Sequence, residues 1–182
     1  MRDLVTDLLE SERLGQGHTA LHLEATDLVS LVQEVADALM ADRGGSSAVR
    51  MEADAGLPQM PVDRTRLRLL VRNLLDNALR HGADARQAPT ITLRRDGPAV
   101  RLSVRDHGPG VDEAALTHLA EPFYRPDAAR TRATGGVGLG LYLCKLVAQA
   151  HGGSFEARNA LPGLEVRVVL PLAASRHSAG TT

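Results

Sequence analysis

Aromatic residues are scarce in this chain of 182 residues, which contains no Trp, two Phe and two Tyr. Hydrophobic residues make up 43% of the sequence, so the core must be built from Leu, Val, Ala and a little Ile. Such a core suits helices packed on a sheet. At this length we expect one domain with a short appendage, because two full domains would be cramped.

The sequence also lacks an excess of either charge and has a single cysteine. Lys and Arg total 21 against 22 Asp and Glu, a formal net charge of −1. This balance gives no general attraction to nucleic acid or to an anionic membrane. Cys144 alone excludes an intrachain disulfide and a Cys-rich metal site, which fits a reducing compartment. We therefore expect a cytoplasmic domain without a nucleic-acid partner, in which any phosphate binding is local.

Long hydrophobic runs are missing as well. No run approaches the roughly 20 apolar residues of a membrane span, and the charged start is not typical of a signal peptide. Near the N-terminus, apolar residues recur at helical spacing from Leu4 to Leu14, and Gly15 and Gly17 end the pattern. Such a short stripe cannot bury its apolar side alone. It either docks on the domain or has lost its natural partner helix, and we favour the missing partner.

The rest of the chain alternates between helical and strand-like patterns. Asp27 and Asp63 are suitable N-caps for two helices, and Asp96-Gly97 is a strong hairpin signal between two strands. The predicted helices cover 27–40, 63–81, 112–119 and 138–150, and the predicted strands cover 49–51, 90–94, 99–104, 155–158 and 165–170. Together these elements predict an α/β fold in which a mixed sheet is covered on one face by helices, followed by a disordered polar tail.

The first chemical motif lies on the helix after Asp63. Asn73, Asn77, Arg80 and His81 are spaced to share one face, while the leucines between them face the core. Amide oxygens suit Mg²⁺, which takes oxygen ligands and also binds nucleotide phosphates. Taken alone, this stripe is more often a solvated polar face.

Two glycine-rich motifs follow. Asp106 comes directly after a strand, and Gly108 and Gly110 provide a tight turn or a close approach of the backbone to a ligand. Glycines from 135 to 140 precede the last helix, whose free N–H groups would bind phosphate oxygens. Their spacing does not fit the Rossmann fingerprint, and the cluster lacks the Lys-Ser/Thr ending of a P-loop.

The order of these motifs, with Glu121-Pro122-Phe123-Tyr124-Arg125 between the second and third, closely resembles the catalytic domain of sensor histidine kinases. The wider group includes gyrase, mismatch-repair ATPases and a heat-shock chaperone. The resemblance covers about 49–170 and implies the two-layer α/β sandwich of the Bergerat (GHKL) ATP-binding fold. It places the N box at 73–81, the two glycine boxes at 106–110 and 136–141, and the F box at 123–125.

The resemblance also implies a role for each site residue. Asn77 would coordinate Mg²⁺, and Asp106 would accept a hydrogen bond from the adenine amino group of ATP. The residues implied to act in catalysis are Asn73, Asn77, Arg80, Arg125 and Arg130. Those implied to contact the nucleotide are Asn73, Asn77, Arg80, His81, Asp106, Gly108, Gly110, Phe123, Gly136, Val137, Gly138, Leu139 and Gly140. Arg125 and Arg130 would belong to a mobile lid.

One substitution separates a kinase from a hydrolase within this group. Hydrolytic relatives place a Glu general base four residues before the Mg²⁺-binding Asn, where this chain has Asn73. Because an amide cannot accept that proton, the resemblance implies transfer to a nucleophile that needs less help, such as a neutral imidazole. No histidine here has the setting of the family's phosphoacceptor. His18 and His22 lie in a predicted linker.

We therefore expect residues 1–17 to be the end of a dimerisation helix and its linker, 18–172 the ATP-binding domain and 173–182 a disordered tail. The expected function is to bind Mg-ATP and donate its terminal phosphoryl group to a histidine on a dimerisation domain outside the chain. The fragment alone should be inactive. A response regulator would act through the full-length protein, whose membrane contact in the bacterial inner membrane would come through segments outside this chain. Two alternatives are an anti-sigma-type protein-serine kinase and a non-catalytic nucleotide-binding regulator.

Overall fold

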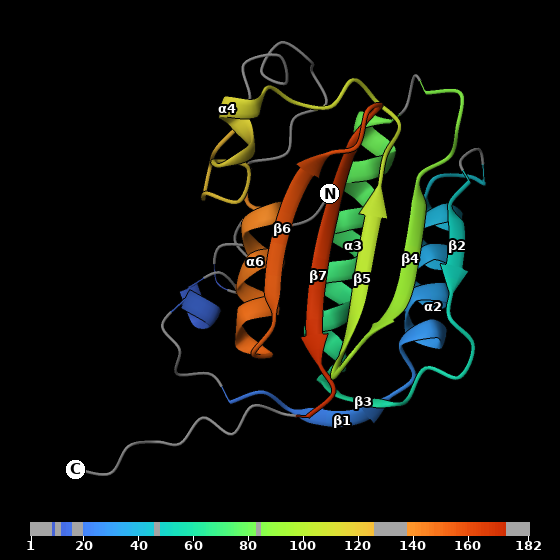
Figure 1. The fold of residues 1–182 in the computed structure, drawn as a ribbon, viewed down its shortest axis with the longest axis vertical. Helices are drawn as coiled ribbons and strands as arrows, with labels where there is room; N and C mark the ends of the chain where they lie inside the picture. The colour runs from blue at the N-terminus through green and yellow to red at the C-terminus, as the bar shows by residue number, and fades with distance from the viewer. Residues whose placement is uncertain are drawn as a thin grey trace.

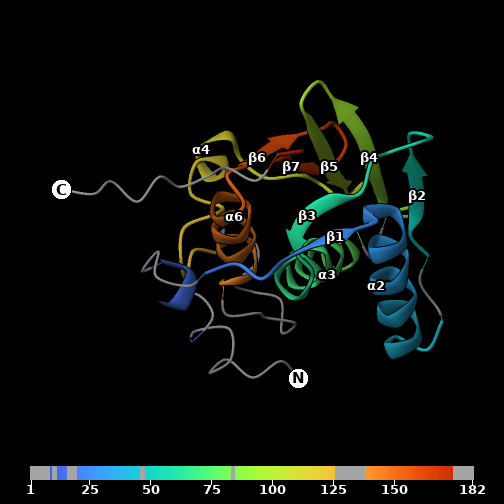
Figure 2. The same ribbon diagram turned by 90° about the horizontal axis from the view of Figure 1, so that it is seen from below.

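The computed structural model describes residues 9, 12–15, 20–45, 48–82, 85–125 and 138–173. These residues form two layers, in which the helices cover one face of a mixed sheet (Figures 1 and 2). The sheet has five strands in the order β2-β4-β5-β7-β6. Their bounds are β2 (Arg50–Ala53), β4 (Thr90–Asp96), β5 (Ala99–Arg105), β6 (Ser154–Asn159) and β7 (Leu164–Pro171). β2 pairs with β4 in parallel, and the other neighbours are antiparallel. The predicted α/β architecture is confirmed.

Three long helices form the second layer, namely α2 (Leu28–Asp42), α3 (Arg64–His81) and α6 (Gly140–Ala150). Both predicted N-caps are confirmed. The Asp27 carboxylate accepts from the backbone N–H groups of Val29 and Ser30, and the Asp63 carboxylate accepts from the N–H of Arg66. The hydrogen bond from Ser30 is the main cause that lowers the pKa of Asp27. The fourth helix is shorter than predicted, because α4 covers only Glu113–Leu116.

The core lies between the two layers and is aliphatic, as the lack of aromatics predicts. Every second residue of the central strands faces the helices, so Leu93 of β4, Leu102 of β5 and Val168 of β7 are fully buried. α3 lies behind the middle of the sheet (Figure 1) and buries Leu67 and Leu70 completely. α3 is therefore the central helix of its layer, and it packs against α2, α6 and the sheet.

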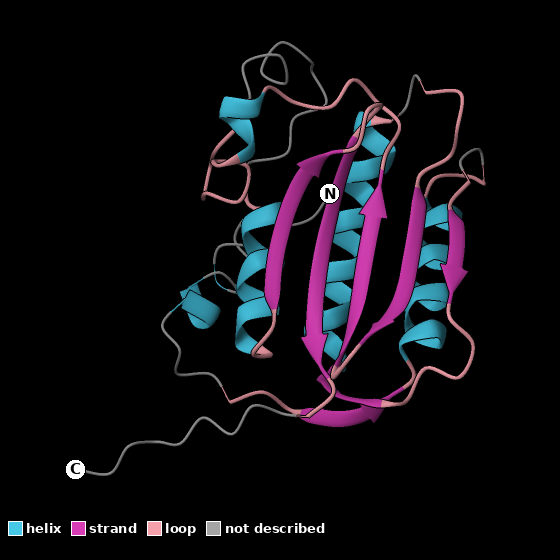
Figure 3. Ribbon diagram, viewed as in Figure 1, coloured by secondary structure: helices cyan, strands magenta, loops and turns pink. Residues whose placement is uncertain are grey.

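Two short strands were missed by the sequence patterns. β1 (Leu23–Thr26) pairs antiparallel with β3 (Met60–Asp63) in a separate two-stranded sheet at one end of the domain (Figure 3). Pro61 stands inside β3, where a proline argues against a strand in a larger sheet. The pair lies beside the first turn of α3, and the backbone N–H of His22 donates to the Asp63 carboxylate over 3.2 Å.

The described part of the N-terminal stretch bears on the two alternatives for that helix. Leu14 is 9% exposed and belongs to the same hydrophobic cluster as the sheet and helices. The Cα position of Gly15 lies beside Tyr142 of α6, whose hydroxyl oxygen would be 4.0 Å from an added Cβ. The last turn of the stretch therefore docks on the domain, which is the alternative that we did not favour. In the described residues, no helix has the length and apolar character of a membrane span.

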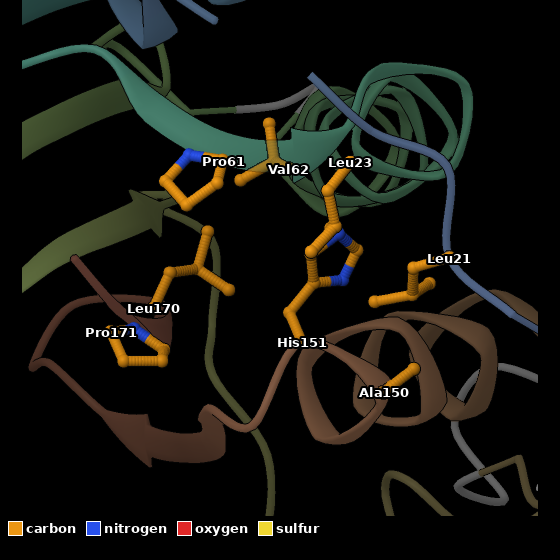
Figure 4. A pocket seen from close by; sticks show the side chains of 8 residues that line it. All are labelled: Leu21, Leu23, Pro61, Val62, Ala150, His151, Leu170 and Pro171. Carbon is orange, nitrogen blue, oxygen red and sulfur yellow. The ribbon is translucent and has the colours of Figure 1, made fainter. Parts of the chain in front are cut away.

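His151 joins the end of α6 to the start of α3. Its Nδ1 lies 2.8 Å from the carbonyl oxygen of Val147, and its Nε2 accepts from the backbone N–H of Asp63 over 3.0 Å. Figure 4 shows the ring beside β3, where His151 lines a small pocket with residues such as Val62. Burial is the main cause that lowers the pKa of His151, and the Val147 carbonyl and the Asp63 charge partly offset it. The ring is therefore neutral, with its proton on Nδ1.

This contact predicts how stability depends on pH. The folded state binds a proton at His151 less readily than the unfolded chain, whose histidine titrates near about pH 6.5. Its contribution to stability is therefore present above that pH and is lost as the pH falls below it. We expect the Tm to fall from pH 7.5 to pH 5. The substitution His151→Gln retains a donor and an acceptor without titrating, so it should flatten that decline. Equal declines in the two proteins would contradict this role.

Candidate nucleotide-binding site

The polar stripe of α3 has the arrangement that its spacing predicts. Leu74, Leu75 and Leu79 are buried in the core, whereas Asn73 and Asn77 are half-buried on the neighbouring face. Asn73 lies beside the first residue of α6, since a Cβ added at Gly140 would be 3.9 Å from its Oδ1. The start of the glycine-flanked helix and the amide stripe are thus side by side.

Arg80 is held on this face by an ion pair. Its Nη2 lies 2.5 Å from Oδ2 of Asp76, one helical turn earlier, and Oδ1 of Asp76 lies 2.7 Å from Nη2 of Arg43 at the end of α2. The three side chains are about one-third exposed. One carboxylate therefore ties two guanidinium groups together, and among the described residues Asp76 is the ion-pair partner of Arg80, whose guanidinium has further donors for an anion.

Asp106 is the most buried polar residue of the candidate site, with 3% of its surface exposed. Its Oδ1 accepts from the backbone N–H of Gly108 over 2.9 Å and from that of Leu164 over 3.1 Å. In the part of the chain that the structure describes, Oδ2 accepts no hydrogen bond. Oδ2 is not one of the buried atoms of the described residues that lack a partner, so it reaches the surface and can receive a donor from a ligand.

The C-terminal end of α3 abuts the turn after Asp106. A Cβ added at Gly108 would overlap the carbonyl oxygen of His81, and one added at Gly82 would be 3.5 Å from the Cβ of Asp106. Glycine is thus required at position 108 by close approach of two backbones. This contact brings the first two predicted motifs together at one end of α3.

The F box lies against the start of the second glycine box. The backbone N–H of Phe123 donates to the carbonyl oxygen of Gly138 over 3.1 Å. Gly138 has a φ of 82°, and a Cβ there would be 2.8 Å from the carbonyl oxygen of Tyr124. Phe123 itself is 58% exposed. Arg125 is half-buried, and Leu139 is buried immediately before α6, which begins at Gly140 rather than at Gly138.

Three of the predicted site residues, Arg130, Gly136 and Val137, lie outside the described residues, as does the rest of the predicted lid. Among the described ones, Gly140 lies beside Asn73, Phe123 bonds to Gly138, and Gly108 abuts His81. Their roles toward a nucleotide stay predictions. Among the described residues there is no cluster of three or more His, Cys, Asp or Glu side chains that could hold a metal.

The sequence analysis missed two residues at this site. Gly163 has a φ of 92°, and a Cβ there would overlap the carbonyl oxygen of Asp106. Asn159, the last residue of β6, bonds to both backbone groups of Val111. Only Gly163 carried a signal, because the pair Pro162-Gly163 between two predicted strands is typical of a turn. Asn159 carried no signal in the sequence, because its partner Val111 is distant along the chain.

The family described as "Histidine kinase-, DNA gyrase B-, and HSP90-like ATPase" matches residues 62–174. The alginate biosynthesis sensor protein KinB of Pseudomonas aeruginosa is 34% identical over 93% of this chain and 28% of its own length. The signal transduction histidine-protein kinase BaeS of Escherichia coli is 35% identical over 93% of this chain and 36% of its own length. The chain thus spans about a third of these relatives.

Solved structures agree with these relatives. Full-length ShkA in complex with AMPPNP is 31% identical over 94% of this chain and 36% of that chain, with a TM-score of 0.75. The catalytic domain of the histidine kinase ThkA is 25% identical over 84% of this chain and 97% of that domain, with a TM-score of 0.70. The chain belongs to this ATPase family, as the catalytic ATP-binding domain of a sensor histidine kinase.

The site geometry makes a prediction about Gly163. Gly163→Ala adds a clash with Asp106 to the strain of a positive φ, so it should cost about 3 kcal/mol of stability or more and weaken ATP binding. Gly97→Ala is the matched control, because Gly97 also has a positive φ of 57° but open space around it. That control should cost about 1 kcal/mol. Urea unfolding and ATP titration measure both effects, and equal losses would refute the close approach.

Proposed function

We propose that this domain binds Mg-ATP and donates the terminal phosphoryl group to a histidine on a dimerisation domain outside the chain, as in two-component signal transduction. The observation that carries the proposal is the placement of three polar groups along the C-terminal half of α3. The turn that follows the Asp106 carboxylate abuts the C-terminal end of α3, and the start of α6 lies beside Asn73 of the amide stripe. The Asp106 carboxylate would bind the base, and the amide stripe and the start of α6 would bind the metal and the phosphates.

The buried carboxylate suits an adenine base. A carboxylate accepts hydrogen bonds and cannot donate them, so it favours the exocyclic amino group of adenine over the carbonyl group of guanine. Oδ1 of Asp106 is already held by two backbone N–H groups, which leaves Oδ2 for the base. Gly108 and Gly110 lie in the turn after Asp106 and leave room for its backbone to approach the base. His81, beside Gly108, would border the ribose or the base.

The polar face of α3 suits the phosphate end of the nucleotide. The amide oxygen of Asn77 would hold Mg²⁺ together with phosphate oxygens and water, a donor set that this ion accepts. The ion would supply neutralisation of charge on the phosphates. Asn73, Arg80 and the N–H groups at the start of α6 would bind the same phosphates. Arg125 follows Phe123 and Tyr124, which contact Gly138, and would act with Arg130 on the terminal phosphate.

The site favours transfer to an imidazole over hydrolysis. Asn73 occupies the position of a hydrolase's general base, and its amide cannot take a proton from water. A neutral histidine needs no such base. Its nitrogen bonds to the terminal phosphorus as the bond from that phosphorus to the bridging oxygen breaks, and ADP leaves. Positioning and charge stabilisation supply most of the acceleration in this reaction.

The remaining partners follow from this assignment. The phosphohistidine would pass its phosphoryl group to a response regulator through the full-length protein, and the domain would work in the cytoplasm. Any contact with the bacterial inner membrane would come through other segments. The serine kinase and the non-catalytic regulator stay alternatives, but the named relatives are sensor kinases.

The metal site is tested by Asn77→Ala. The change should abolish Mg²⁺-dependent ATP binding without loss of stability, because alanine is the better helix former. Gln149→Ala is the control, since it removes an exposed amide from α6 near the far end of that helix. Calorimetry with ATP in the presence of Mg²⁺ or of EDTA measures the effect. Retained metal dependence in Asn77→Ala would exclude the assigned role.

The reaction is tested with labelled ATP. The domain alone should bind Mg-ATP but neither label itself nor release phosphate appreciably, because it has no acceptor and no base. Addition of a dimerisation domain with its histidine should give a labelled partner whose label is lost in acid. Acid-stable label on a partner would instead support the serine kinase. Rapid phosphate release from the domain alone would support an ATPase, and tight binding without transfer to any partner would support the regulator.

A further inference from the structure

We propose that Asn159 is a positioning residue for adenine recognition, and that it acts by holding the turn between Asp106 and Val111 in place. This inference rests on the proposed function, in which Asp106 binds the base. Asn159 is half-buried at the end of β6, on the face of the sheet that carries the helices. It would not touch the nucleotide itself.

The Asn159 side chain pairs with Val111 as a neighbouring strand would. Its Oδ1 accepts from the backbone N–H of Val111 over 3.0 Å, and its Nδ2 donates to the carbonyl oxygen of Val111 over 2.7 Å. Nδ2 also lies 3.3 Å from a carboxylate oxygen of Glu113. An amide is the one uncharged side-chain group that offers a donor and an acceptor in this geometry.

The turn depends on such side-chain bonds because its backbone has few of its own. In the described ranges, no backbone-to-backbone hydrogen bond outside the regular elements involves residues 107–111. The backbone N–H of Gly108 bonds to Asp106, and that of Val111 bonds to Asn159. The two ends of the turn are thus fixed by two side chains, and the glycine-containing stretch between them would otherwise be free to shift.

Gly110 shows how closely Asn159 fits the turn. Gly110 has a φ of 74°, and an added Cβ would be 2.8 Å from Oδ1 of Asn159 and 3.4 Å from the carbonyl oxygen of Gly163. Asn159 and Leu164 are also register partners between β6 and β7. Since Leu164 bonds to Asp106 through its backbone, the end of one hairpin holds both ends of the turn.

Loss of Asn159 should therefore affect recognition of the base more than folding. Residues outside the turn stay in place, because the paired strands β6 and β7 do not need this side chain. When the turn shifts, Asp106 and Gly108 no longer match the adenine edge, whereas the phosphate-binding face of α3 is unchanged. ATP then loses its advantage over GTP, which never made the bond to the carboxylate. A purely structural role would weaken both nucleotides alike.

The test measures ATP and GTP affinities by competition, with Tm measured alongside. Asn159→Ala should weaken the affinity for ATP by about tenfold, as expected for the loss of the two hydrogen bonds to Val111. It should also lower the ratio of ATP to GTP affinity. Asn159→Asp keeps the size of the side chain but loses the donor to Val111, so it should act in the same direction. Arg158→Ala is the control, because Arg158 is an exposed neighbour that pairs with Glu165 on the opposite face.

Asp106→Asn separates this inference from the proposed function. If the wild-type domain does not bind ATP, or if Asp106→Asn keeps the preference for ATP, the proposed function fails. If Asp106→Asn loses the preference but both Asn159 variants retain it, only the positioning role is overturned. Equal weakening of ATP and GTP in the Asn159 variants, with a lower Tm, would also overturn it. Should Asn159→Ala not fold, the isosteric Asn159→Asp decides the question by the same ratio.

Discussion

The site depends on how the Asp106 carboxylate replaces a backbone group at the end of a strand pair. β5 and β7 pair up to Arg105 and Glu165, and the next pair would be Asp106 and Leu164. There the Asp106 N–H still donates to Leu164, but the Leu164 N–H donates to the Asp106 side chain. One carboxylate oxygen is therefore fixed by the sheet and by Gly108, and the direction of the other follows from it. A buried charge needs such partners to be tolerated at all.

This arrangement explains why glycines surround the carboxylate. A side chain at Gly163 would overlap the Asp106 carbonyl, and one at Gly108 would overlap the end of α3. At these two positions the backbones of α3, of the turn and of the β6–β7 hairpin are so close that an added Cβ would overlap a neighbouring backbone atom. Because the same contacts place α3, its amide stripe is set relative to the carboxylate. The base-binding and metal-binding ends of the proposed site are thus parts of one packing arrangement.

Local patterns were enough to predict most of the fold. The caps at Asp27 and Asp63, the Asp96-Gly97 hairpin and the alternation in β5 and β7 are encoded by neighbouring residues, and all were found where expected. β1 and β3 were missed because they stabilise each other across the chain and one contains Pro61. The motifs identified Asp106 and the α3 stripe. The supports of Asp106, Leu164 and Asn159, could not be predicted, since they act through contacts between distant segments.

The two ends of the domain depend on different interactions. At the end with β1 and β3, His151 joins α6 to α3 through two hydrogen bonds to backbone groups that no ligand could replace. At the other end, Asp76 holds Arg80, and Asp106 and Asn159 hold the two ends of a turn. α3 and α6 run between the two ends, so rigid packing at the first keeps their spacing at the second. A nucleotide bound along α3 would then meet a helix pair, α3 and α6, that is already packed together.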